Sequence, residues 1–420
     1  DEAELSLAAE TEADFVAASF VRSAADVYTI SDALDDRGAD IPVVAKIERA
    51  GAVENLDRII EAAYGVMVAR GDLGVEMPLE DVPIIQKRII RKCHATGTPV
   101  ITATEMLDSM VSARRPTRAE ASDVANAVLD GTDAVMLSGE TAVGDDPVRV
   151  VATMDRIVRQ IEATDESDES REARIPTADT DSRTEALARS ARYLARDVGA
   201  SAIVAASESG YTARKTAKFR PGVPVVATTP DDRIRRQLAL SWGITPTYSA
   251  YREDIDRMMD DAVDVALDAG VATSGDTLVV LSGMMTELEE TNTTNMLKLH
   301  VAAEAVAMGR TVVGGRVAGP LAASEDGDLS AVPTGAILSL PASFDGEFDG
   351  DTSKIAGIVD ARPGMTGYPA LVARELDIPM ISGAPVLDRL SSGTAVTLHA
   401  ERGVVYEGDL IRHRRRESGR

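Results

Sequence analysis

Charged side chains follow two short apolar segments within residues 43–74. Lys46 and Glu48 end the first segment, and Asp72 comes shortly after the second. The segments are continuously apolar, which is typical of parallel strands buried on both faces. Charges at the ends of such strands are costly to bury without a purpose. Carboxylate oxygens bind Mg²⁺ or Mn²⁺, and a lysine neutralises phosphate charge, so these residues predict a divalent-cation site for a phosphorylated substrate.

The surrounding residues 1–163 alternate between candidate strands and amphipathic helical stretches, which predicts a parallel βα array in an α/β fold. The candidate strands lie at 15–20, 43–47, 65–69, 100–103 and 134–137. The polar residues that end or follow these strands are Ser19, Lys46 with Glu48, Asp72, Thr104 and Glu140. A doubly wound sheet concentrates such groups at one switch point, whereas a TIM (β/α)8 barrel collects them from all its strands. We therefore predict a partial TIM barrel with five of the eight strands.

Later parts of the chain differ in composition. Residues 164–182 are acidic and lack periodicity, so we expect an acidic linker or surface excursion. Residues 183–302 repeat an α/β pattern. Residues 303–411 form a smaller β-rich domain around one helix near 368–376, and 412–420 are a basic tail.

In the second α/β pattern, small hydroxyl residues surround a glycine between a strand and a helix. They are Ser207, Ser209, Gly210 and Thr212. A turn of this kind can cradle a phosphate at a helix N-terminus. It is equally compatible with a plain N-cap and a tight turn. The spacing alone leaves both alternatives open.

The composition excludes several classes of protein. The net charge is −25, from 69 acidic and 44 basic residues, of which seven are lysines. An acidic surplus with little lysine is typical of halophilic cytoplasmic proteins, the alternative being an ordinary acidic bacterial protein. We expect no binding to nucleic acid, because no basic stripe exists, and none to membranes, because no apolar run reaches spanning length. The single Cys93 fits a reducing cytoplasm.

Six motifs in residues 1–163 resemble the catalytic domain of pyruvate kinase. They are Val-Ala-Ala-Ser-Phe-Val-Arg at 16–22, Ala-Lys-Ile-Glu at 45–48, Val-Met-Val-Ala-Arg-Gly-Asp-Leu-Gly-Val-Glu at 66–76, Val-Ile-Thr-Ala-Thr-Glu-Met-Leu at 100–107, Arg-Pro-Thr-Arg-Ala-Glu at 115–120 and Asp-Gly-Thr-Asp-Ala-Val-Met-Leu-Ser-Gly-Glu-Thr at 130–141. The resemblance implies transfer of the phosphoryl group of phosphoenolpyruvate to ADP, giving pyruvate and ATP in the last step of glycolysis. It also implies a homotetramer.

The resemblance assigns roles to the strand-end residues. Lys46 would donate to the transferring phosphoryl group, and Thr104 would lie beside the enolate that must be protonated. Glu48 and Asp72 would hold Mg²⁺ or Mn²⁺. The implied substrate contacts are Ser19, Lys46, Arg70, Gly71, Asp72 and Thr104.

Structural alternatives exist for several of these residues. Lys46 can form an ion pair without a catalytic role, and Ser19 can be an ordinary hydrogen-bonded hydroxyl at a strand end. Arg118 and Glu120 are expected to serve a subunit interface rather than the chemistry.

Residues 183–302 resemble the C-terminal regulatory domain of the same family, ending in the matching Thr-Thr-Asn-Met-Leu-Lys at 293–298. The resemblance makes Ser207, Ser209, Gly210 and Thr212 candidates for binding the phosphate of an effector. Relatives activated by sugar phosphates often carry lysine where Glu208 stands here. A carboxylate repels phosphate, so we expect the effector to differ or to be absent.

Residues 303–411 resemble the mobile, swivelling phosphohistidine domain of enzymes that use phosphoenolpyruvate. The matching stretch is Gly-Met-Thr-Gly-Tyr-Pro-Ala-Leu-Val at 364–372. Tyr368 stands where that family has its phosphorylated histidine. We therefore expect no phosphocarrier role for this domain.

The family's first three barrel strands and its lid domain have no counterpart in the sequence, which does not begin with Met. We therefore expect an N-terminally incomplete chain that carries barrel strands 4–8, with the family's K⁺ site outside it. We expect residues 1–420 alone to be inactive. The alternative is a truncated, non-catalytic paralogue that binds an effector or full-length subunits.

Overall fold

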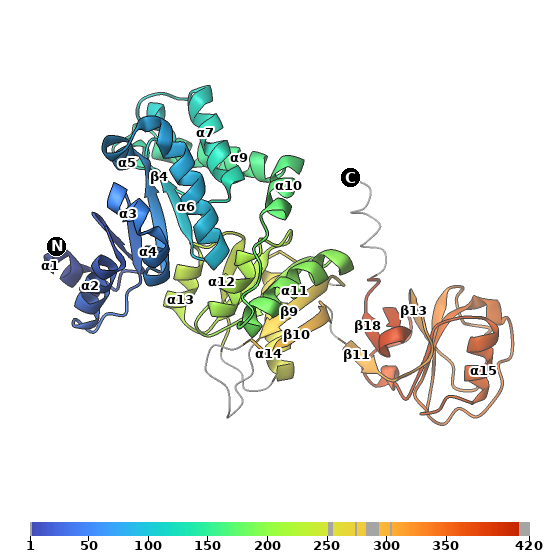
Figure 1. The fold of residues 1–420 in the computed structure, drawn as a ribbon. Coiled ribbons are helices and arrows are strands. Elements are labelled where there is room, and N and C mark those ends of the chain that lie inside the picture. Colours follow the sequence, from blue (N-terminus) through green and yellow to red (C-terminus); the bar gives the residue numbers. More distant parts are fainter. Residues whose placement is uncertain (1, 251–254, 274, 283–293, 303–304, 411–420) are drawn as a thin grey trace. The chain divides into compact units, whose positions relative to one another are not determined.

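The computed structural model describes residues 2–250, 255–273, 275–282, 294–302 and 305–410 (Figure 1). The chain divides into two compact units. One comprises Asp1–Val271 and Leu278–His300, and the other comprises Ala272–Thr277 and Val301–Arg420. Within the described ranges, no helix is both long and apolar enough to cross a membrane. The basic tail at 412–420 lies outside the described residues.

The first sheet contains five strands in chain order, and every pair of neighbours is parallel. Its strands are β1 (Val16–Ala18), β2 (Val43–Ile47), β3 (Gly65–Ala69), β4 (Val100–Ala103) and β5 (Ala134–Val135). The predicted bounds of β2, β3 and β4 are confirmed. β1 is shorter than predicted because Phe20 has φ +60, which ends an extended strand. β1 and β5 form the two edges of this sheet, so these five strands do not close into a barrel.

Helices alternate with these strands, as the hydrophobic periodicity predicts. They are α1 (Glu2–Glu10), α2 (Ala24–Asp35), α3 (Ala50–Glu54), α4 (Leu56–Ala62), α5 (Arg70–Glu76), α6 (Val82–Thr96), α7 (Arg118–Asp130), α8 (Gly139–Ala142) and α9 (Pro147–Glu162), with short 3₁₀ turns at Leu79–Asp81 and Asp108–Val111. Residues 50–62 do not form one helix but are divided between α3 and α4. Asn55 lies at the break, where its side-chain amide donates to the carbonyls of Gly51 and Arg22.

The first half of the acidic stretch 164–182 forms helix α10 (Asp165–Ala173), which its lack of periodicity did not predict. Thr164 caps this helix by accepting a hydrogen bond from the Ser167 amide. Acidic residues occupy its first turn and Arg171 its last, as the helix dipole favours. The helix lacks an apolar face, and polar groups attach it to its neighbours instead. Ser170 Oγ, for example, donates to the Leu129 carbonyl of α7 at 3.0 Å.

The second sheet has the order β10-β9-β6-β7-β8, and the pairs β6–β7, β6–β9 and β7–β8 are parallel. Its strands are β6 (Ala202–Ala206), β7 (Val225–Thr229), β8 (Ile244–Tyr248), β9 (Thr277–Ser282) and β10 (Met296–Val301), and its helices are α11 (Arg183–Val198), α12 (Tyr211–Lys218), α13 (Asp232–Leu238) and α14 (Ile255–Asp268). The sequence did not predict β8 or β10. Both are edge strands, and Pro246 within β8 is tolerated only in such a position.

The second unit contains a mixed sheet of eight strands in the order β11-β18-β17-β13-β14-β15-β16-β12. Its elements are β11 (Ala305–Met308), β12 (Arg310–Val313), β13 (Arg316–Ala323), β14 (Ala336–Leu340), β15 (Ile355–Asp360), β16 (Met380–Ser382), β17 (Ala395–His399), β18 (Val404–Glu407) and α15 (Tyr368–Glu375), with 3₁₀ turns at Thr352–Lys354, Val386–Asp388 and Ala400–Arg402. Gly315 lies between β12 and β13 and has φ +120, and a Cβ there would lie 2.9 Å from Pro379 Cγ.

Candidate active site

The Lys46 ammonium lies at the carboxyl edge of the first sheet between two oxygen atoms. Lys46 Nζ donates to Ser19 Oγ at 3.0 Å and forms an ion pair with Glu48 Oε2 at 3.0 Å. Ser19 follows β1 and Lys46 lies in β2, and these two strands pair in parallel. The Lys46 side chain is 24% exposed, so solvent and ligands can reach the ammonium. The structure thus brings three of the predicted residues together.

Glu48 is a charged residue with a side chain only 3% exposed. Its Oε1 accepts a hydrogen bond from the Phe20 amide at 2.5 Å, and its Oε2 pairs with Lys46. The left-handed backbone of Phe20 turns the chain after β1 and so directs this amide toward the carboxylate. A carboxylate has about four acceptor positions, so these contacts leave capacity for a cation.

Gly71 and Asp72 lie in the first turn of α5, which begins directly after β3. The Gly71 amide donates to Thr104 Oγ1 at 3.3 Å, and a Cβ at residue 71 would lie 3.1 Å from Thr104 Cγ2. Glycine therefore allows the start of α5 to lie against the end of β4. Asp72 is exposed, so its carboxylate remains open to solvent at this edge.

The Arg70 guanidinium lies against the chain that follows β4. Nε donates to the Ala103 carbonyl at 3.0 Å, and Nη2 donates to the Thr104 carbonyl at 2.7 Å and to Met106 Sδ at 2.8 Å. Nη1 contacts Gln86 Oε1 at 3.5 Å and pairs with Asp123 at 2.6 Å. These contacts engage all five N–H donors of an arginine. The Arg70 side chain therefore has no donor left for a substrate, and its part in the site is to hold the backbone around Thr104.

Thr104 adopts an unusual backbone conformation at the end of β4. Its φ is +71 and that of Glu105 is +54, a region that side chains other than glycine and asparagine rarely adopt. Such strain persists only where the surroundings enforce it. Arg70 supplies that restraint through the Ala103 and Thr104 carbonyls. Sequence reasoning identified Thr104 and Arg70 separately but missed Asp123, which pairs with Arg70 from 53 positions away in the chain.

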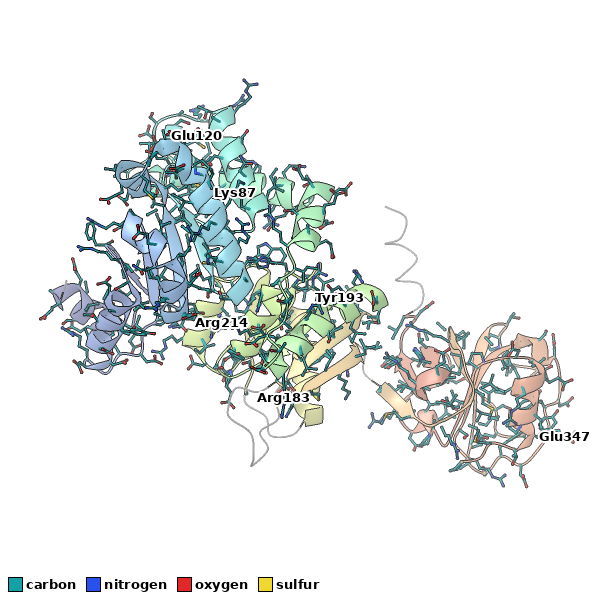
Figure 2. The ribbon with its side chains drawn as sticks, in the orientation of Figure 1. Lys87, Glu120, Arg183, Tyr193, Arg214 and Glu347 are labelled. Carbon is teal, nitrogen blue, oxygen red and sulfur yellow. The ribbon has the colours of Figure 1, made fainter. Side chains whose placement is uncertain are left out.

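Two further acidic residues near this edge are engaged in local structure. Glu140 is 1% exposed and accepts hydrogen bonds from the Leu107 and Ser138 amides. Glu120, at the start of α7 (Figure 2), accepts from Ser109 and Thr117 through backbone and hydroxyl groups. Burial raises the pKa of Glu120, but these hydrogen bonds outweigh it and leave the pKa below its usual value. Both carboxylates hold loops in place.

Two residues of the turn at 207–212, the candidate effector site, are packed against other parts of the chain. Gly210 has φ +71 at the N-cap of α12, and a Cβ there would lie 2.9 Å from Leu238 Cδ2 of α13. Thr212 is buried, with 4% exposure, and its hydroxyl shares a hydrogen bond with Thr294 Oγ1 at 2.8 Å. Ser207 and Ser209 complete the turn, and Ser209 is exposed. Gly210 is the N-cap of α12, so the alternative of a plain N-cap with a tight turn agrees with the structure, and binding of an effector phosphate stays a prediction.

Tyr368 begins α15 in the second unit. Its ring packs edge-on against Phe348, with the ring centroids 5.4 Å apart, and Phe348 stacks on Phe344 at 5.8 Å. The position that the resemblance assigns to a phosphorylated histidine therefore holds a ring within an aromatic cluster.

Comparison with protein families assigns each part of the chain. Residues 1–151 match the barrel domain of pyruvate kinase, residues 185–300 match its alpha/beta domain, and residues 332–403 match the mobile domain of PEP-utilising enzymes. The three matches follow the order predicted from the sequence motifs.

Curated relatives agree with this assignment. The chain is 41% identical to a pyruvate kinase of Bacillus licheniformis over 399 residues, which covers 94% of this chain and 67% of the relative. It is 42% identical over 402 residues to a pyruvate kinase of Geobacillus stearothermophilus, and 41% identical over 397 residues to one of Staphylococcus aureus (strain MRSA252), with the same coverage. These relatives give no support to a halophilic origin, which stays a prediction from composition. On the strength of these similarities and of the ordered domain matches, the chain belongs to the pyruvate kinase family.

Proposed function

We propose that this chain transfers the phosphoryl group of phosphoenolpyruvate to ADP, giving pyruvate and ATP. The observation that carries the proposal is the placement of Lys46 at the carboxyl edge of the first sheet, between Ser19 and the buried Glu48. Thr104 and Asp72 follow neighbouring strands of the same sheet. Family membership supports the same reaction.

In the reaction, the bond between phosphorus and the enol oxygen breaks, and a bond forms to an oxygen of ADP. The phosphoryl group passes through a loose transition state with negative charge on its oxygens. The Lys46 ammonium is placed to neutralise that charge. Ser19, which accepts from Lys46, keeps the ammonium aligned with the edge of the sheet.

The remaining enolate must gain a proton on carbon to become pyruvate. Thr104 Oγ1 accepts from the Gly71 amide, so its own O–H is free to donate. We propose that this hydroxyl holds the proton beside the enolate. The contacts from Arg70 to the Ala103 and Thr104 carbonyls keep the hydroxyl in place through the backbone.

The donor set suits a magnesium or manganese ion. Glu48 and Asp72 offer two carboxylates, and among the described residues no group of three or more His, Cys, Asp or Glu could hold a metal. Mg²⁺ commonly takes one or two carboxylates and completes its shell with substrate oxygens and water. When bound there, the ion would neutralise phosphate charge and orient the phosphoryl oxygens.

Several finer assignments belong to the same proposal. The chain would divide into domains and segments that end at residues 163, 182, 302 and 411, and the first sheet would be part of a TIM barrel. The protein would be a homotetramer, would use K⁺ and would reside in the cytoplasm. The mobile-domain region would be a structural or regulatory appendage. The inactivity of residues 1–420 alone stays a prediction from the sequence.

The test is a coupled assay that follows pyruvate formation from phosphoenolpyruvate and ADP with Mg²⁺. The natural protein that contains these residues should turn over at about 1 per second or faster, the low end for kinases. Binding of phosphoenolpyruvate without pyruvate formation would favour the non-catalytic paralogue instead. The same assay on residues 1–420 alone decides the expected inactivity.

A further inference from the structure

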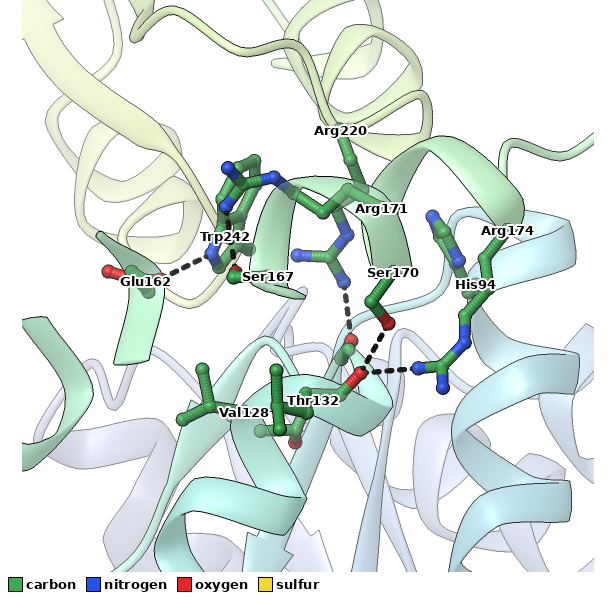
Figure 3. A pocket seen from close by; sticks show the side chains of 12 residues that line it. His94, Val128, Thr132, Glu162, Ser167, Ser170, Arg171, Arg174, Arg220 and Trp242 are labelled. Carbon is green, nitrogen blue, oxygen red and sulfur yellow. Dashed lines mark hydrogen bonds between the residues drawn. The ribbon is translucent and has the colours of Figure 1, made fainter. Parts of the chain in front are cut away.

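A pocket within the first unit lies where helices of the first sheet meet helix α10 and the chain before β8 (Figure 3). It is partly open to solvent and leaves a volume of about 30 Å³ for the centres of water-sized groups. It is distinct from the carboxyl edge of the first sheet and from the 207–212 turn, since it contains no residue of either. The residues that line it are His94, Val128, Leu129, Gly131, Thr132, Glu162, Ser167, Ser170, Arg171, Arg174, Arg220 and Trp242.

The lining of this pocket is basic, although the protein as a whole carries a net charge of −25. Arg171, Arg174 and Arg220 contribute three guanidinium groups, and Glu162 is the one carboxylate in the lining. That carboxylate already accepts a hydrogen bond from Trp242 Nε1 at 2.7 Å. A concave surface with this charge balance attracts a small anion.

Two buried nitrogen atoms in the lining have no hydrogen-bond partner among the described residues. They are His94 Nε2 and Arg220 Nε, in residues that are 8% and 5% exposed. A buried polar group without a partner costs about 1–3 kcal/mol, so such groups call for an explanation such as a missing ligand or water. Burial, and then the charge of Arg220, lower the pKa of His94 to about 4. His94 is therefore neutral near pH 7. Its hydrogen bond to the Lys218 backbone uses the other ring nitrogen, so Nε2 carries the lone pair and can accept a hydrogen bond from a protonated oxygen of an anion such as monohydrogen phosphate.

The arginines are held in place by other contacts, so the pocket is already formed. Arg220 Nη2 donates to the Gly131 carbonyl at 2.8 Å and pairs with Asp133 Oδ1 at 3.1 Å. Its guanidinium also lies 5.0 Å from the centroid of the Trp242 ring. Asp133 also accepts hydrogen bonds from the amides of Val100, in β4, and Trp242, in the chain before β8. It therefore connects the first sheet to the chain that carries Trp242.

Helix α10 supplies the remaining two cations. Arg171 pairs with Asp168 and lies 5.5 Å from the centroid of the Trp242 ring. Arg174, which is exposed, donates to the Leu129 carbonyl (Figure 3). Because a guanidinium has five donors, both side chains retain N–H groups beyond these contacts.

We propose that this pocket binds a phosphate group, either inorganic phosphate or the phosphate of a small monoester. Arginine forks match phosphate oxygens, and the lone pair on His94 Nε2 can accept from a protonated phosphate oxygen. The bound anion would bridge Arg171 and Arg174 of α10 to Arg220, which lies in the chain after α12. Helix α10 also contacts α7 through Ser170 and the Leu129 carbonyl, and Asp123 of α7 pairs with Arg70, which holds the Thr104 turn. Any effect on catalysis rests on the proposed function, whereas phosphate binding does not.

The test measures binding of inorganic phosphate to the full chain by isothermal titration calorimetry, in metal-free buffer without sulfate and at constant ionic strength. We expect a dissociation constant of about 1 mM or lower, and at least about tenfold weaker binding in Arg171→Gln/Arg174→Gln. The double variant Arg171→Lys/Arg174→Lys keeps the charge and should bind within about threefold of the wild type, since lysine also binds phosphate. A wild-type chain that does not bind phosphate would overturn the proposal.

Two controls identify the site. Arg235→Gln removes an arginine that, like Arg171, pairs with an aspartate three residues earlier, but lies on α13 outside the pocket. It should bind phosphate as the wild type does. Lys46→Met should also leave binding unchanged; if it abolishes binding while the double glutamine variant does not, the phosphate sits at the first sheet and the proposal is wrong.

The source of the phosphate is decided by a second titration with glycerol 3-phosphate. Tighter binding than inorganic phosphate, lost in the double glutamine variant, identifies a phosphate monoester as the ligand. Weaker binding, lost in the same variant, identifies free phosphate. Binding of either ligand that survives the loss of both arginines contradicts the proposal.

Discussion

The carboxyl edge of the first sheet and the turn after β6 begin from similar sequence patterns but differ in structure. In both, a buried parallel strand leads into a helix with small or polar residues near its start, directly from β3 to α5 and across residues 207–210 from β6 to α12. At the first edge, Lys46 is 24% exposed and Asp72 is exposed. At the turn, Gly210 packs against Leu238, and the Thr212 hydroxyl is buried against Thr294.

The difference shows that polar residues at strand ends serve two purposes. A reactive site leaves charged groups accessible while other side chains hold them, as Glu48 and Ser19 hold Lys46. A structural turn pairs its hydroxyls with other protein atoms and lets a neighbouring helix fill the remaining space. The predictions below test whether the two regions separate in this way.

The largest effect is expected for Lys46→Met. Loss of the ammonium removes a charge placed where the transition state accumulates negative charge, so activity should fall by about a thousandfold or more. Steady-state assay of the natural protein measures the loss. Lys92→Met is the matched control, because Lys92 also forms an ion pair, with Asp57 at the surface, but lies on α6 outside the proposed site. Activity of Lys46→Met within tenfold of the wild type would remove Lys46 from the chemistry.

Glu48→Gln and Asp72→Asn should each raise the Mg²⁺ or Mn²⁺ concentration needed for half-maximal activity. Because the two carboxylates would share one ion, the effects should be strongly non-additive in the double variant. Metal titrations of both single variants and the double variant provide the measurement. Unchanged half-saturation in both single variants would mean that neither carboxylate binds the metal.

Gly210→Ala should destabilise the protein without affecting the active site. The new Cβ would meet Leu238 at 2.9 Å in a backbone with φ +71, so overpacking and left-handed strain together should cost about 2–4 kcal/mol. Urea unfolding measures the change in the free energy of unfolding. Gly38→Ala is the control, since it has a similar φ of +71 but nothing within 4 Å of the added atom. Equal losses in the two variants would show that packing does not fill the 207–212 turn.

The smallest effect is expected in the second unit, where phosphoenolpyruvate should leave no stable label. Tyr368 has no imidazole nitrogen to attack phosphorus, and its ring is packed against Phe348. Incubation with labelled phosphoenolpyruvate, followed by an alkaline work-up that preserves phosphohistidine, is the measurement. Label that maps to residues 303–411 would contradict the prediction.

The sequence by itself determined the elements of the first sheet and the residues at its carboxyl edge. The bounds of β2, β3 and β4 could be predicted because strands buried on both faces are continuous apolar runs. Lys46, Glu48 and Asp72 stood out because charges are rare at such positions. Edge strands such as β8 carry no comparable signal, and α10 has no apolar face, so both were missed.

Only the tertiary structure decided how these residues act. It showed that Nε and Nη2 of Arg70 hold the chain around Thr104, while Nη1 contacts Gln86 and Asp123. It also assembled the basic pocket from α6, α7, α10, the chain after α12 and the chain before β8, which are distant from one another in the sequence. The physical reason is the same in both cases. Hydrogen bonding and burial depend on neighbours in space, and a local pattern cannot reveal whether a polar group is already engaged or still open to a ligand.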